Sequence, residues 1–343
     1  MKYPEFLKQG DTIGICALSC GIVEEDDIKR LDEAKENLKN MGYKVLETAH
    51  VRTQEGGAST DAKTRVDEFM ELYRNPEVKL IILAAGGDYQ FETLDYLDFD
   101  ELNSLPPKWV EGYSDCTNST FILTSILDIA SVYCQSIKDF SMRPLFRNLE
   151  DALKIVSGEN MLVQESFEMH EPIGFNLDDP ERALENKYNL TEKVEWKNLR
   201  GEESLSFSGR ALGGCLDCIE PLFGTKYDKI GEFIEKYKDD GIVWFFDCFS
   251  YSTPRLEVVL WKMNHLGYFK NCKGIIFGRP LFVTEEYDIT FRDAVYNRFK
   301  NSNIPVILDA DIGHVSPQFA MITGSIIEVE SKNGKGKVKT LLK

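Results

Sequence analysis

Short apolar runs alternate with longer amphipathic segments through the first half of the chain. The runs at 12–18, 43–47 and 79–85 are rich in aliphatic and β-branched residues, which is typical of buried strands. Between them, apolar residues recur at helical spacing, and Gly42 stands where the first of these helices should end. Strands that alternate with helices in this way predict a parallel sheet covered on both faces.

The second half of the chain mixes the two periodicities. Apolar runs at 242–246, 274–278 and 304–308 predict further strands, and a helix follows Pro254. The segment 321–329 predicts antiparallel strands joined by a turn at its Thr-Gly pair. We therefore expect an α/β protein with an N-terminal doubly wound parallel-sheet domain and a C-terminal mixed α+β domain.

A polar stretch without clear periodicity separates the two halves, from Glu171 to about Glu203. Prolines interrupt it, and so long an irregular connection is uncommon inside one domain. The expected organisation is an N-terminal domain over 1–160, a polar crossing with a long loop over 161–208, and a C-terminal domain over 209–343.

The composition of the chain disfavours some classes of binding partner. The chain has 343 residues and a formal net charge of -17, which argues against a nucleic acid or an anionic membrane as partner. Its N-terminus has no signal-peptide pattern, and no apolar run reaches membrane-spanning length, so we expect a cytoplasmic protein. Cys215 and Cys218 have metal-site spacing but no second ligand pair, so we expect neither a metal nor a cofactor.

A serine stands where a strand is expected to turn sharply into a helix. Gly112-Tyr113-Ser114-Asp115 follows the run 107–111 and precedes the apolar helical segment 118–127. This geometry exposes the Ser114 hydroxyl as a nucleophile and frees the Asp115 amide to bind an oxyanion. The same sequence is also compatible with a serine that only caps a helix.

A glycine pair follows a neighbouring strand. Gly86-Gly87 comes directly after the run 79–85, and the carboxyl ends of parallel strands meet at one edge of a sheet. We therefore expect the two loops to share a site in which the bare amide of Gly87 approaches a substrate carbonyl. The alternative is a glycine pair that only permits a tight turn.

A catalytic serine needs a base, which is nearly always a histidine. Of the four histidines, only His314 follows a strand of the C-terminal half, in a loop fixed by Gly313 and Pro317. We therefore select His314 as the candidate base. The alternative is a loop histidine that hydrogen-bonds to the backbone.

Gly112-Tyr113-Ser114-Asp115-x-Thr117 and Gly313-His314 resemble the two signatures of the LD-carboxypeptidase family of serine peptidases. Within that family the chain is similar to the microcin C self-immunity branch, on segments that include 86–88, 213–217 and 224–228. The resemblance implies a homodimeric, metal-free enzyme with a Ser-His-Glu triad. Its substrates would be murein L,D-peptides or peptidyl and aminoacyl nucleotides of the microcin C type.

Carried over to this chain, the resemblance implies Ser114 as nucleophile, His314 as base, and the amides of Gly87 and Asp115 as the oxyanion hole. The family's triad glutamate, however, falls at Phe246, and a second acidic position falls at Ser250.

Asp247 is the nearest replacement for the glutamate, but neighbouring side chains on a strand point to opposite faces. Unless the strand ends or bulges at this point, Asp247 should face away from His314. Asp309 or Asp311 could orient the histidine instead. The alternative function is a degenerate relative that binds a peptide or nucleotide ligand without cleaving it.

Overall fold

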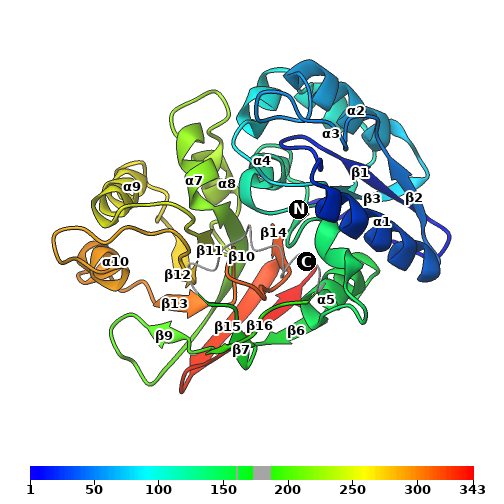
Figure 1. Ribbon diagram of the computed structural model, residues 1–343. Helices are drawn as coiled ribbons and strands as arrows, with labels where there is room; N and C mark the ends of the chain where they lie inside the picture. The colour runs from blue at the N-terminus through cyan, green and yellow to red at the C-terminus, as the bar shows by residue number, and fades with distance from the viewer. Residues whose placement is uncertain (160, 173–186) are drawn as a thin grey trace. The chain divides into compact units, whose positions relative to one another are not determined.

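The computed structural model describes residues 1–159, 161–172 and 187–343 (Figure 1). Its contacts divide the described chain into two units. The first consists mainly of 1–159 with Ala320–Ile322, and the second mainly of 161–172, 188–319 and Thr323–Lys343. Each unit is built on its own sheet.

The first unit contains a six-stranded sheet in the order β14-β5-β4-β3-β1-β2. The pairs from β2 across to β5 are all parallel. The strands are β1 (Thr12–Cys16), β2 (Lys44–Glu47), β3 (Val78–Leu83), β4 (Trp109–Glu111), β5 (Ser131–Tyr133) and β14 (Met321–Thr323).

Each parallel strand is followed by a helix, and the first four of these helices connect it to the next strand of the sheet. The helices are α1 (Glu25–Asn40), α2 (Ala62–Arg74), α3 (Phe99–Ser104), α4 (Thr117–Ser125) and α5 (Arg147–Val156), with the 3-10 turns η1 (Gln90–Asp95), η2 (Ser114–Cys116) and η3 (Ile137–Ser141). Asp61 caps α2 by accepting the amide of Thr64 at 3.0 Å. The apolar face of α2 packs with residues of β1, β3 and α4 in one core cluster, which fixes the strand ends that carry the loops.

The second unit contains an eight-stranded sheet in the order β6-β16-β15-β10-β11-β12-β13-β9. Its centre, β10 to β13, is parallel, and its outer pairs are antiparallel. The strands are β6 (Met161–Glu165), β9 (Lys197–Asn198), β10 (Ser204–Cys215), β11 (Ile242–Asp247), β12 (Cys272–Gly278), β13 (Val306–Ala310), β15 (Ile326–Lys332) and β16 (Lys335–Leu341).

Helices of the second unit follow the parallel strands. They are α7 (Leu216–Ile219), α8 (Ile230–Lys236), α9 (Thr253–His265) and α10 (Phe291–Phe299), with the 3-10 turn η4 (Glu220–Leu222). A separate two-stranded ladder joins β7 (Met169–His170) to β8 (Glu192–Lys193). No helix in the described ranges is both long and apolar enough to cross a membrane.

The predicted fold class is confirmed: a parallel sheet forms the N-terminal unit, and a mixed sheet forms the second one. The domain limits themselves stay a prediction. Within the polar crossing, short strands form at β7, β8 and β9, which are too brief to leave a periodic pattern, and residues 173–186 lie outside the described residues.

One expectation about the C-terminal strands is wrong. The turn at Gly324 is present, but the strands on either side of it belong to different sheets. β14 lies beside β5 in the first sheet, whereas β15 pairs with β10 and β16 in the second. Local alternation predicts strands but cannot say which sheet each one joins.

Candidate functional site

Ser114 has the sharp backbone turn that the sequence predicts. It comes shortly after β4, opens η2 and has a φ of 59°, in the left-handed region that non-glycine residues rarely adopt. Gly112 permits the turn, because a Cβ atom there would stand 2.7 Å from the Cβ of Cys116. A strained serine between a strand and a helix is the geometry that exposes a nucleophile.

The glycine pair after β3 lies against Ser114, so these two loops share one edge of the first sheet. A Cβ atom added to Gly86 would be 2.9 Å from the Cβ and 3.0 Å from the Oγ of Ser114. Gly87 has a φ of 149°, and a Cβ there would overlap Ser19 Oγ and Cys20 Sγ. Only glycine allows the backbone of this loop to approach the serine so closely.

The Asp115 carboxylate ties together three segments around Ser114. It accepts hydrogen bonds from Ser19 Oγ at 2.5 Å, from the Gln90 amide at 2.8 Å and from Asn118 Nδ2 at 2.9 Å. Burial raises the pKa of Asp115, and the bond from Ser19 acts in the opposite direction. The side chain of Asp115 therefore shapes the loops, while its amide remains the candidate oxyanion donor.

In the second unit, His314 lies next to an acid. Its Nδ1 atom is 2.6 Å from Oδ2 of Asp247, and both side chains are buried. The ring of Phe249 packs on the imidazole with centroids 4.5 Å apart. A carboxylate at Nδ1 favours the tautomer with its proton on that nitrogen, which leaves Nε2 able to accept a proton.

The strand does end at this point: Asp247 is the last residue of β11, and its carboxylate lies beside His314. Phe246 is fully buried, stacked on Trp244 with centroids 5.3 Å apart and packed on Phe277 at 5.4 Å. The carboxylate beside the histidine therefore stands one residue after the position at which the resemblance expected a glutamate.

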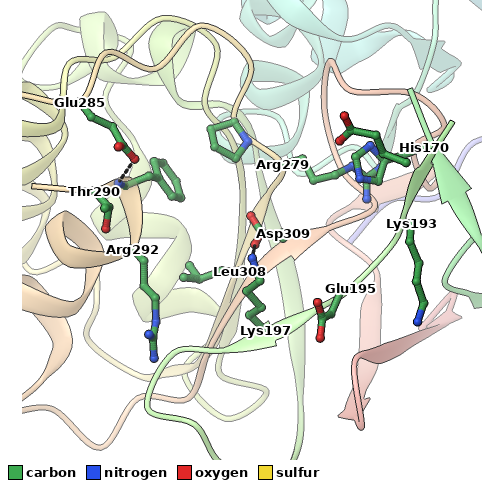
Figure 2. Close-up of a pocket in the computed structure, with 13 residues that line it drawn as sticks. His170, Lys193, Glu195, Lys197, Arg279, Glu285, Thr290, Arg292, Leu308 and Asp309 are labelled. Atoms are coloured by element: carbon green, nitrogen blue, oxygen red, sulfur yellow. Dashed lines mark hydrogen bonds and ion pairs between the residues drawn. The ribbon is translucent and has the colours of Figure 1, made fainter. Parts of the chain in front are cut away.

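The alternative acids are held elsewhere. Asp309 forms an ion pair with Lys197 at 2.9 Å on the wall of a pocket of about 410 Å³ that neither His314 nor Asp247 lines (Figure 2). Asp311 is fully buried; it accepts hydrogen bonds from Arg279 Nη1 at 2.8 Å and from the Trp196 indole at 2.9 Å. These contacts give Asp311 a structural role.

The remaining sequence candidates do not form a second centre. His50 binds Glu68 at 2.6 Å, His170 contacts the Glu171 carbonyl, and His265 contacts the Trp261 carbonyl. Within the described parts of the chain, no group of three His, Cys, Asp or Glu side chains could hold a metal ion.

Sequence reasoning missed two residues that organise these loops. Ser19 follows β1 and binds Asp115, and Asp217 follows β10 and binds the loop after Asp247. Both come just after buried strands of a parallel sheet region, which is the signal that could have found them.

Comparison with known families gives matches in both halves of the chain. Residues 13–134 match the LD-carboxypeptidase N-terminal domain, and residues 208–329 match the LD-carboxypeptidase C-terminal domain. The chain is 31% identical over 325 residues to a probable murein peptide carboxypeptidase of Bacillus subtilis, covering 94% of this chain and 89% of that protein.

Two further similarities extend over nearly the whole chain. It is 24% identical to the microcin C7 self-immunity protein MccF of Escherichia coli, covering 95% of this chain and 92% of that one. It also superposes, with a TM-score of 0.78 and 21% identity, on an MccF-like protein from Streptococcus pneumoniae in complex with AMP, covering 97% and 99% of the two chains.

Proposed function

The chain belongs to the LD-carboxypeptidase family, and on that basis we propose that it is a serine hydrolase that uses Ser114, His314 and Asp247 to cleave amide bonds. The contact of 2.6 Å between Asp247 and His314 carries this proposal. A carboxylate at Nδ1 holds the imidazole in the tautomer that a general base needs and stabilises the imidazolium that forms.

In the proposed reaction, Ser114 Oγ attacks the carbonyl carbon while Nε2 of His314 takes the hydroxyl proton. The amides of Gly87 and Asp115 donate hydrogen bonds to the oxyanion. Collapse of this intermediate breaks the C–N bond, and the proton on His314 passes to the leaving amine. A water molecule, deprotonated by His314, then attacks the acyl-enzyme carbonyl. The second intermediate releases the acid product, and His314 returns the proton to Ser114 Oγ.

The substrate we propose is a small peptidyl or aminoacyl amide conjugate. Two classes are supported by the relatives: a murein L,D-peptide, and an aminoacyl nucleotide of the microcin C type. The AMP complex of the structural neighbour favours the nucleotide class. A cytoplasmic location and a homodimer remain parts of the proposal, because they come from the resemblance and from composition.

A non-catalytic relative that only binds such ligands is the competing function. It depended on the missing glutamate at Phe246 and the serine at Ser250. The contact between the Asp247 carboxylate and His314 supports the catalytic proposal over this alternative.

Fluorophosphonate labelling tests the catalytic assignment. Wild type should be labelled on Ser114, as mapped by mass spectrometry, and both Ser114→Ala and His314→Ala should lose the label. Folded wild-type protein that takes no label would favour the binding protein. Incubation with a murein tetrapeptide or an aminoacyl sulfamoyl nucleotide, followed by mass spectrometry of the products, then separates the two substrate classes.

A further inference from the structure

The loop that follows Asp247 is held by one carboxylate. Asp217, in the first turn of α7, accepts the amide of Phe249 at 3.0 Å and the amide of Ser250 at 2.9 Å. It also accepts the Ser250 hydroxyl at 3.0 Å. Hydrogen bonds to an ionised carboxylate are about twice as strong as bonds between neutral groups, so this is a firm attachment.

The loop's other anchors act on its carbonyl groups. The amide of Leu281 reaches the Cys248 carbonyl at 3.3 Å, and the amide of Phe282 reaches the Phe249 carbonyl at 2.7 Å. The Asp217 carboxylate accepts the hydrogen bonds of the loop's amides, which without it would hydrogen-bond to water. The segment 248–250 is therefore fixed from both sides.

This segment positions both neighbours of the imidazole. Asp247 precedes it and contacts Nδ1 of His314, and Phe249 within it packs on the His314 ring. Strand pairing also places Asp217 close to Asp247 along the sheet. Cys215, two residues before Asp217, is paired with Asp247 in the ladder of β10 and β11. A shift of the loop would move the imidazole's acid and its ring contact together.

We propose that Asp217 is a positioning residue that holds His314 in its catalytic orientation through the loop 248–250. It contacts neither the substrate nor the imidazole in this role. The inference rests on the proposed function, since it concerns the histidine assigned there as base. An error of about 1 Å in the placement of a catalytic group can cost about 100-fold in rate, which sets the expected size of the effect.

The test compares Asp217→Ala, Ser250→Ala and the double variant by the kinetics of fluorophosphonate labelling. Asp217→Ala should lower the maximal inactivation rate about 10- to 100-fold while the concentration for half-maximal rate changes less than twofold. Ser250→Ala removes one of the three bonds and should cost only a few-fold. In the double variant, the Ser250 change should add nothing further, because its partner is already gone.

Glu232→Gln, on the exposed face of α8, is the matched control, because it removes the same charge and leaves the loop intact. It should label at the wild-type rate. An Asp217→Ala protein that keeps its melting temperature and labels like the control overturns the inference. If Asp217→Ala fails to fold, Ser250→Ala still decides: an unchanged labelling rate contradicts the role.

A second readout does not depend on activity. The imidazole nitrogen chemical shifts of His314 report its tautomer. We expect one tautomer in wild type and a mixture in Asp217→Ala. A single tautomer in both proteins overturns the positioning role. An unlabelled wild type whose His314 tautomer still depends on Asp217 would instead contradict the proposed hydrolase while supporting the positioning role.

Discussion

Gly313 packs directly against the carboxylate of Asp247, so that a Cβ atom added to the glycine would overlap Oδ1 of the acid. Gly313 also has a φ of 93°, which side-chain-bearing residues avoid. The residue before His314 is thus constrained twice, by its backbone conformation and by the acid beside it. This double constraint explains why a glycine precedes the histidine.

Replacing Gly313 should displace the acid. We expect Gly313→Ala to lower the rate of Ser114 labelling by about 100-fold, because the new methyl group pushes the Asp247 carboxylate away from His314. Gly267→Ala is the matched control: its φ is 79°, and a Cβ there meets nothing within 4 Å. Both variants should lose about 1 kcal/mol of stability from the backbone strain. Equal labelling by the two variants would exclude the steric explanation.

Loss of the Asp247 carboxylate should lower turnover far more than loss of the alternative acid Asp309. By analogy with serine proteases whose triad acid is replaced by the amide, Asp247→Asn should lower turnover by about four orders of magnitude. Asp309→Asn, which breaks only the ion pair with Lys197, should leave turnover within about twofold. Steady-state rates on whichever conjugate proves to be cleaved provide the measurement. A large loss in Asp309→Asn with a normal Asp247→Asn would reverse the assignment.

The backbone strain at Ser114 should make a glycine at this position more stabilising than an alanine. Ser114→Gly and Ser114→Ala both remove the hydroxyl, but only glycine accepts a φ of 59° without cost. We expect Ser114→Gly to be about 1 kcal/mol more stable than Ser114→Ala in chemical denaturation, and neither to be labelled. Equal stabilities would mean that the turn stores no measurable strain.

A buried carboxyl group in the first sheet should make the free energy of unfolding decrease as pH rises. Glu111, at the end of β4, is fully buried, and its carboxyl oxygens have no hydrogen-bond partner among the described residues. Burial raises the pKa of Glu111 from 4.5 to about 8. Between these two values the folded chain keeps a proton that the unfolded chain has lost, so the free energy of unfolding decreases as pH rises.

Glu111→Gln should therefore be neutral near pH 4 and stabilising above pH 8, with an upper bound of about 5 kcal/mol. Urea denaturation at both pH values measures the difference. Glu203→Gln, at an exposed position of the second unit, should show no such pH-dependent gain. A Glu111→Gln protein whose advantage is the same at both pH values would show that Glu111 does not titrate in this range.

The sequence could predict those parts of the site that depend on local order along the chain. Ser114 stands between a strand and a helix, and Gly86-Gly87 ends the neighbouring strand, so parallel-sheet geometry alone brings the two loops to one edge. The acid could not be settled in this way. Whether Asp247 or Phe246 faces His314 depends on where β11 ends, and a shift of one residue moves a side chain to the other face.

Asp217 illustrates a second limit of sequence reasoning. Its partners, Phe249 and Ser250, are more than thirty residues away and contribute mainly backbone amides, which every residue except proline possesses. The position of Asp217 after a buried strand could have singled out the residue, but no side-chain pattern identifies these partners. The sequence also could not predict that β14 and β15 belong to different sheets. The reason is related: β14 lies beside β5, which is far from it along the chain.

The position of β14 also matters while the protein is being synthesised. β5 ends at Tyr133, but its sheet neighbour begins only at Met321, so roughly 190 residues are translated between them, which takes about 10 to 40 s at ordinary elongation rates. During that interval the nascent N-terminal sheet has an unpaired edge at β5, which could pair with another chain. We therefore expect a fragment truncated before Met321 to aggregate more readily than the full chain, because its β5 edge stays unpaired.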